Sequence, residues 1–156
     1  MVSSALFANQ RETNLASTVA LIEAALIELG QPPESRVDDR SALFAWQIPK
    51  GSSITHVALI HRREFTHLRV SATVMTLDAR VDRGSLFAHL LDLNAALCGV
   101  AFATQADRVL LVGERSTLDL DRSEILDLIR RVTAYADEHD DVLVARFGGR
   151  RGANLT

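Results

Sequence analysis

The sequence predicts a single α+β domain with the element order α-β-β-β-α-β-β-α. Apolar residues recur every three or four positions in three stretches, as on one face of a helix. In five shorter stretches they alternate with polar residues or run without interruption, as in strands. Successive strands have short connections, so they should pair antiparallel. The 156 residues correspond to one domain, which we assign to residues 1–149, with a flexible tail at 150–156.

The first helix is predicted to start at Asn9 and to end before Gly30. Asn9 and Glu12 form a capping-box pattern, and Gly30 is a typical helix stop. The apolar residues between them lie on one helical face: Leu15, Val19, Ile22, Leu26 and Leu29. This helix should therefore pack on a core, and Pro32-Pro33 prevents its continuation.

Three strands are predicted next, at Leu43–Ile48, Ile54–His61 and His67–Val74. The second of them is apolar almost throughout, which is typical of a central strand covered on both faces. The third alternates strictly, so that Leu68 and its apolar partners should face the core while Arg69 and its polar partners face away. Together the three strands form an antiparallel meander.

The second helix is predicted from a cap at Asp82 or Ser85 to Gly99. Its main stripe consists of Leu86, Leu90, Leu93 and Leu97. Phe87 and Leu91 add a second apolar stripe, so the helix needs another partner besides the sheet. We predict a second copy of the chain as that partner, with Phe87, Leu91 and Cys98 at the dimer interface.

A strand hairpin, Val100–Thr104 and Val109–Glu114, precedes the last helix. This helix is predicted from a cap at Asp121 to Phe147, although β propensity alone would allow a sixth strand at Val142–Phe147. One long helix is favoured because His139, Leu143 and Phe147 continue its apolar stripe in phase. The acidic residues Asp119, Asp121 and Glu124 are better explained by capping and charge stabilisation of the helix N-terminus than by catalysis.

The composition excludes several classes of protein. The formal net charge of −3 argues against non-specific nucleic-acid binding. Cys98 is the only cysteine, so an intramolecular disulfide is impossible and a reducing compartment fits best. The sequence shows neither a signal-peptide pattern nor an apolar run of about 18 residues. We therefore expect a cytoplasmic protein without membrane contact.

The side chains that most often carry chemistry do not form a convincing site. His56, His61 and His67 lie on or beside neighbouring strands with Glu64 between them, but His56 and His61 have opposite strand parity. Cys98 lies at a helix C-terminus, where the helix dipole disfavours a thiolate, and it is better explained as a small packing residue. We expect no metal, no cofactor and no catalytic residue, and hence no enzyme.

A cluster of arginines supports an alternative function. Arg62, Arg63 and Arg69 lie at the second hairpin of the meander, where they would contact nucleic-acid phosphates. Phe65 is the aromatic residue beside them that would stack on a base. Solvated turns or ion pairs within the protein explain the same arginines more simply, given the acidic total charge.

The segment Leu90–Leu97 followed by Gly99–Ala103 resembles the YbjN-like bacterial family. The hairpin strand Val109–Glu114 and the closing Phe147-Gly148-Gly149 carry the same resemblance, and the element order matches over almost the whole chain. This family is similar in fold to the class I type III secretion chaperones. The resemblance implies a strongly twisted antiparallel sheet, a homodimer and binding of another polypeptide without catalysis. It also implies a loose association with bacterial stress responses and regulation.

We therefore expect a dimeric, chaperone- or adaptor-like module that binds an unidentified bacterial polypeptide. Strand parity predicts that the partner contacts the sheet face that carries Arg69, Ser71, Thr73 and Met75. The alternative is that the helices of the chain cover this face. Pairing of a partner strand with a sheet edge is a second mode of binding used by proteins of this kind.

Overall fold

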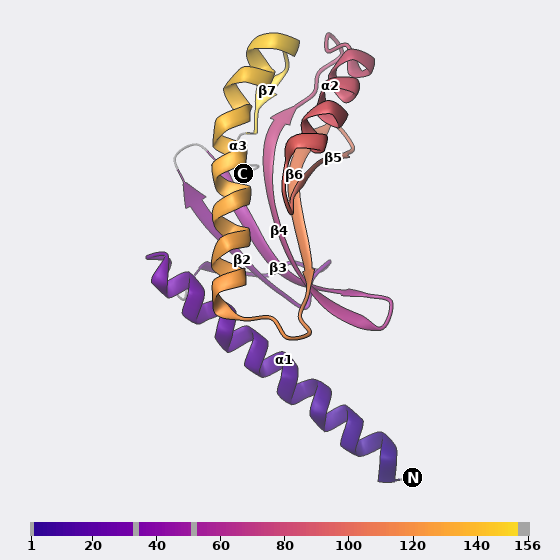
Figure 1. Ribbon diagram of the computed structural model, residues 1–156, viewed down its shortest axis with the longest axis vertical. Helices are drawn as coiled ribbons and strands as arrows, with labels where there is room; N and C mark the ends of the chain where they lie inside the picture. The colour runs from indigo at the N-terminus through magenta and orange to yellow at the C-terminus, as the bar shows by residue number, and fades with distance from the viewer. Residues whose placement is uncertain (1, 33–34, 51–52, 153–156) are drawn as a thin grey trace.

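The computed structural model describes residues 2–32, 35–50 and 53–152, and for residues 2–13 it describes the backbone alone. This part of the chain forms three helices and a seven-stranded antiparallel sheet with the strand order β1-β2-β3-β4-β6-β5, in which β7 pairs with β4. Figure 1 shows that the sheet is strongly twisted and that α3 lies along it. None of the helices in the described ranges is long and apolar enough to span a bilayer.

The elements have the following bounds. They are α1 (Val2–Glu28), β1 (Arg36–Val37), β2 (Phe44–Lys50), β3 (Ser53–Arg62), β4 (Phe65–Thr76), α2 (Arg83–Ala96), β5 (Ala101–Gln105), β6 (Arg108–Ser116), α3 (Arg122–Phe147) and β7 (Arg150–Arg151). The predicted fold class, the meander β2–β3–β4 and the hairpin β5–β6 are confirmed. Strands β1 and β7 were not predicted, because two residues cannot show a periodicity.

The start of the first helix was predicted wrongly. Helix α1 runs through Asn9 and begins at Val2, so Asn9 does not cap it. The segment before Asn9 contains Ala, Leu and Phe without Gly or Pro, and such residues can extend a helix. The predicted stop is confirmed, since Gly30 adopts a φ of 74° and the Gln31 N–H donates to the Leu26 carbonyl at 2.9 Å.

The caps of the other two helices follow the sequence closely. Asp82 caps α2 by accepting from the N–H groups of Gly84 and Ser85. Asp121 and Glu124 form a complete capping box at the start of α3, as predicted. Helix α3 continues as one helix to Phe147, and Gly148 with a φ of 81° follows it. Helix α2 ends at Ala96, three residues before the predicted stop at Gly99.

The end of the described chain is ordered further than predicted. Arg150 and Arg151 pair with Thr76 and Met75 of β4, and the Gly152 N–H donates to the Val74 carbonyl at 3.0 Å. The prediction of a flexible tail from Arg150 therefore fails for residues 150–152, because backbone pairing holds this segment to the sheet. The remainder of the predicted tail, 153–156, lies outside the described residues.

The core lies between the sheet and the two long helices. Its side chains include Ile22 and Leu26 of α1, Trp46, Val57, Val70 and Leu111 of the sheet, and Ile125 and Val132 of α3. Among the side chains that the structure describes, Thr55 of β3 and Thr133 of α3 are the two buried polar ones, and their hydroxyl oxygens lie 3.3 Å apart. Helix α3 therefore covers the sheet face to which Thr55 belongs, and alternate residues of each strand point to the other face.

Candidate functional site

The sheet face opposite α3 is the broadest candidate surface, and we call it the open face. It carries small, polar and short apolar side chains that are exposed or partly exposed: Gln47, His56, Ile60, Arg69, Ser71, Thr73, Val112 and Glu114. The strand registers place them in rows, such as Gln47–His56–Ser71–Val112 across β2, β3, β4 and β6. These rows form one continuous polar and apolar surface across four strands.

Three of the four residues predicted to contact a partner lie on the open face. Arg69, Ser71 and Thr73 alternate along β4 and are partly exposed. Met75 is completely buried, so its inclusion is corrected. The register between β4 and β6 shifts between Thr73 and Met75, which reverses the strand parity and turns Met75 into the core. The sequence pattern gave no sign of this bulge.

Charged side chains cross the open face at one end. Arg69 and Glu114 are directly opposite one another in the β4–β6 register and form an ion pair. Arg62 of β3 donates from Nε and Nη2 to the same carboxylate, at 3.0 and 2.7 Å. These hydrogen bonds, first of all those from Arg62, hold the pKa of Glu114 below its usual value. Arg63, the third residue of the predicted nucleic-acid cluster, is exposed in the β3–β4 turn with a φ of 54°.

The histidines of the meander do not converge. His56 and His67 lie on the open face, whereas His61 has the opposite parity on β3. Burial lowers the pKa of His56, an effect that Asp39 opposes and Arg108 reinforces. The Nδ1 atom of His67 is buried without a hydrogen-bond partner in the described part of the chain. Residues 2–32, 35–50 and 53–152 contain no cluster of three or more potential metal ligands.

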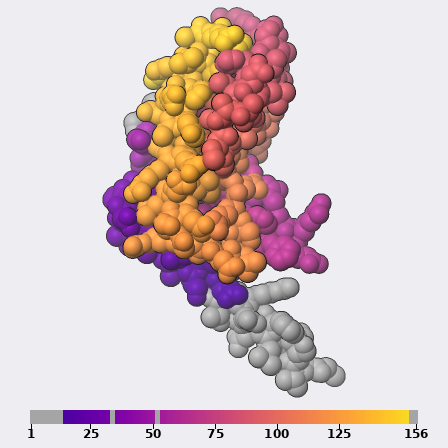
Figure 2. Space-filling view, in the orientation of Figure 1, coloured from indigo at the N-terminus to yellow at the C-terminus, as the bar shows by residue number. Residues whose placement is uncertain are grey.

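Helix α2 provides a second candidate surface. Leu86 and Leu90 are buried against the domain, whereas Leu91 is 69% exposed and Phe87 is partly exposed. Cys98, just after the helix, is exposed and does not pack in the core of the single chain. Figure 2 shows α2 and α3 forming a continuous surface on this side of the molecule, with the β3–β4 hairpin projecting beside it.

One edge of the sheet is blocked at one residue by a side chain. Strand β5 is at the end of the strand order, where its free side could accept another strand. Asn94 of α2 accepts from the Phe102 N–H at 2.7 Å and donates to the Phe102 carbonyl at 3.2 Å. The Asn94 amide thus makes the two bonds that a neighbouring strand would make. At the other edge, β1 has only two residues.

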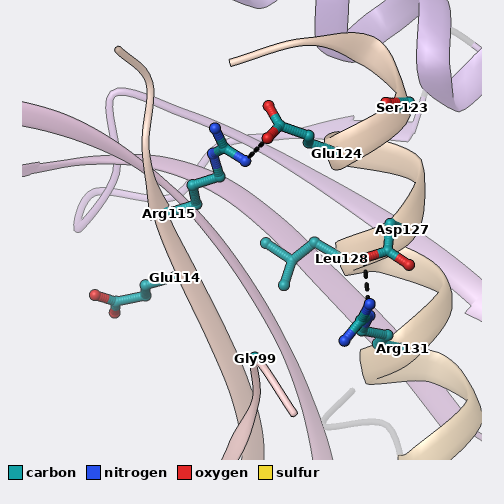
Figure 3. A pocket seen from close by; sticks show the side chains of 8 residues that line it. All are labelled: Gly99, Glu114, Arg115, Ser123, Glu124, Asp127, Leu128 and Arg131. Carbon is teal, nitrogen blue, oxygen red and sulfur yellow. Dashed lines mark hydrogen bonds and ion pairs between the residues drawn. The ribbon is translucent and has the colours of Figure 1, made fainter. Parts of the chain in front are cut away.

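A groove of about 540 Å³ lies between β6, the start of α3 and the loop after α2. Its charged side chains are paired: Arg115 with Glu124, and Arg131 with Asp127 at 2.8 Å (Figure 3). Glu114 contributes to its wall, but its side chain points away from the other labelled residues. These four charged side chains pair within the groove, and the Ser123 hydroxyl donates to Asp121 Oδ1 at 2.6 Å, so their polar groups are satisfied within the protein.

Two residues of these surfaces were not recognised in the sequence. Glu114 was assigned only as the last residue of a strand, and its partners become visible once β3, β4 and β6 are placed side by side. Asn94 was noted only within a family-like stretch of the second helix. Its place in the mostly apolar stretch Leu90–Leu97 was the available signal, since an amide that is partly buried there needs hydrogen-bond partners.

The strand order and the helices that cover one face of the sheet are those of the type III secretion chaperone fold. The chain belongs to the family described as T3SS (YopN, CesT) and YbjN peptide-binding chaperone 1 (TY-Chap1), whose sequence model matches residues 16–154. The predicted resemblance is thereby confirmed. No curated protein sequence matches the chain significantly.

Several solved structures share the fold. The ExsC–ExsE complex contains a chain with a TM-score of 0.62 and 15% identity, covering 82% of this chain and 94% of that one. The Yersinia pestis type III secretion chaperone SycH, solved with a fragment of YscM2, has a TM-score of 0.54 and 18% identity, covering 76% and 96%. An uncharacterized protein from Methanothermobacter thermautotrophicus has a TM-score of 0.60 and 14% identity, covering 83% and 98%. At these identities the likeness shows the fold alone.

Proposed function

We propose that this chain is a dimeric, non-catalytic module that binds an extended segment of another polypeptide on its open face. The observation that carries the proposal is the open face itself, on which exposed and partly exposed side chains surround Ser71 in rows that cross four strands. Membership of a peptide-binding chaperone family supports it. So do the relatives of known structure, several of which were solved as complexes with another protein.

One edge of the sheet supports binding on the face over strand addition. Asn94 occupies the backbone groups of Phe102 on β5, whereas the two residues of β1 pair only with Ala45 and Trp46 and leave the rest of β2 as an edge. A partner segment that lies across the rows of the open face needs neither edge. Its side chains would pack between those of β3, β4 and β6, as an apolar segment packs on a sheet surface.

Affinity capture tests this proposal with a matched pair of variants. Ser71→Arg places a long charged side chain in the middle of the open face, and we expect at least a tenfold loss of co-purified partner. Ala134→Arg makes the same change on the exposed side of α3, where no loss is expected. The tagged proteins are expressed in the native host, and captured proteins are quantified by mass spectrometry after nuclease treatment. Equal recovery with the two variants would contradict binding on the open face.

The dimer is proposed to form through α2, with Phe87, Leu91 and Cys98 at the interface. Exposed apolar side chains supply the driving force, at about 25 cal/mol per Å² removed from water before the costs of association. Leu91→Asp should convert the dimer to a monomer in light scattering. Leu118→Asp is the control, because Leu118 is equally exposed, at 71% against 69%, but lies in the β6–α3 loop. If Leu91→Asp still had the mass of a dimer, the proposal that α2 forms the interface would be wrong.

The compartment and the pathway belong to the same proposal. A single cysteine, Cys98, fits a reducing compartment such as the cytoplasm. A role in stress response or regulation remains a prediction of the family resemblance. Nucleic-acid binding is less well supported, since Arg62 and Arg69 share a carboxylate in the protein. A nucleic-acid-binding function predicts an affinity for DNA or RNA that falls steeply with salt concentration and with the double substitution Arg62→Ala/Arg63→Ala.

A further inference from the structure

The arginines of the open face outnumber the carboxylates that they contact. Arg62 and Arg69 both bind Glu114, so two guanidinium groups share one negative charge. An arginine keeps its charge at all physiological pH values and offers five N–H donors. The three side chains remain within reach of solvent, with exposed fractions of 51% for Arg62, 28% for Arg69 and 26% for Glu114. This cluster therefore carries a net charge of about +1 and unused donors.

The positive cluster is unusual for its setting. The whole chain has a formal charge of −3, yet the other titratable side chains identified on the open face, His56 and His67, add no negative charge. The nearest acid along the chain is Glu64, which lies in the β3–β4 turn. The positive potential of the two arginines is thus not cancelled by a second carboxylate on the face itself.

Apart from His67 and Ser71, which flank Arg69 on β4, the surroundings of the cluster are small or apolar. Ala58 lies opposite Arg69 in the β3–β4 register, and Ile60 precedes Arg62 by two positions on the same side of β3. Val112 precedes Glu114 by two positions on β6. An extended segment places every second side chain on one side, about 7 Å apart, so an acidic residue over the arginines brings its neighbours over this apolar floor.

We propose that the polypeptide segment bound on the open face is acidic, with a partner Asp or Glu carboxylate held between Arg62 and Arg69. This inference rests on the proposed function and names the chemistry of the segment. The incoming carboxylate takes the donors that Glu114 leaves unused, and two arginines can hold it with charge-assisted hydrogen bonds. Glu114 competes with it for the two guanidinium groups.

The geometry favours a peptide carboxylate over a nucleic-acid backbone. A phosphate backbone requires a row of basic side chains along its path, and here two guanidinium groups converge on one point. Glu114 lies between them, where it would repel each phosphate of a polyanion. A single carboxylate on an otherwise apolar segment meets this repulsion once and gains two arginine partners.

Fluorescence anisotropy tests the inference with three probes of equal length. The first is a 12-residue peptide of alternating Val and Ser with one Glu at its centre, the second replaces this Glu by Gln, and the third is a 12-nucleotide oligothymidine. We expect the Glu peptide to bind about fivefold or more tightly than the Gln peptide, as one or two exposed charge pairs permit. Arg62→Gln/Arg69→Gln should abolish this preference. Arg80→Gln is the control, because Arg80 pairs with Asp78 before α2, away from the cluster.

Glu114→Gln is the decisive variant, since it removes the competing carboxylate and leaves both arginines. It should bind the Glu peptide several-fold more tightly than the wild type does, a gain that misfolding cannot produce. Equal binding of the two peptides by the wild type would overturn the acidic preference and leave the proposed function standing. Binding of neither peptide would overturn both. Tighter binding of the oligonucleotide than of the Glu peptide would overturn the inference in favour of nucleic acid.

Discussion

Trp46→Ala is expected to lower the free energy of unfolding by about 3–5 kcal/mol. Trp46 is 1% exposed on β2, and the registers place it in the same row as Val57 and Val70 on the helix-covered face. It also stacks on Phe44, with ring centroids 6.4 Å apart. Removing the indole leaves a cavity that the surrounding sheet and helices cannot close. The loss of stability therefore combines the lost free energy of burying the indole with the cost of the empty cavity.

Trp46→Phe is the informative companion, with an expected loss of about 1–2 kcal/mol. The indole Nε1 is buried without a hydrogen-bond partner among the described residues, so phenylalanine removes an unsatisfied donor while it keeps most of the ring. Urea unfolding followed by circular dichroism measures both variants without relying on tryptophan fluorescence. If the phenylalanine variant were as unstable as the alanine variant, Nε1 would have a partner that contributes to stability.

Gly113→Ala is expected to destabilise the protein by about 1–3 kcal/mol through overpacking. A Cβ at this position on β6 would lie 2.5 Å from Leu128 Cδ1, 3.1 Å from Val100 Cγ1 and 3.2 Å from the Gly99 carbonyl oxygen. The absent side chain thus lets α3 and the loop after α2 approach the sheet closely. The substitution pushes α3 away from β6 at the groove shown in Figure 3.

A double-mutant cycle with Leu128→Ala separates this explanation from a general effect on β6. Removing the leucine side chain makes room for the new methyl group, so the double variant should be more stable than the sum of the two single losses predicts. Urea unfolding of the four proteins provides the coupling free energy. Strictly additive losses would mean that Leu128 does not limit the space at Gly113.

Substitutions at Trp46 and Gly113 can be compared with substitutions on the open face to distinguish effects on folding from effects on binding. Trp46 and Gly113 belong to the helix-covered side, and their substitution should reduce stability and, only through stability, partner binding. Ser71 and Arg69 belong to the open face, where partly exposed side chains can be changed at little cost in folding. A variant that binds poorly but unfolds normally therefore identifies a contact residue.

Much of the fold could be predicted from periodicity, because periodicity reports on one face of one element. The stripe His139, Leu143 and Phe147 correctly favoured one long α3 over a sixth strand. The same reasoning failed for Met75, since a bulge changes strand parity without changing the composition. The helix start at Asn9 was wrong because a good cap does not prevent residues before it from being helical.

The candidate site was predicted less completely, because it depends on long-range pairing. Arg69, Ser71 and Thr73 could be placed on one face from their alternation alone. The contact of Arg62 and Arg69 with Glu114 requires the register of three strands, and residues 62 and 114 are 52 positions apart. The role of Asn94 likewise depends on how closely α2 approaches β5. No local pattern carries either piece of information.

Site-specific photo-cross-linking in the native host tests the central claim most directly. A photoreactive amino acid is placed at Ser71 on the open face or, as the matched control, at Ala134 on the exposed side of α3. Binding on the open face predicts a discrete, protease-sensitive adduct with another polypeptide at position 71 and none at position 134. An adduct at position 134 alone, or an adduct at position 71 that disappears with nuclease, would contradict it.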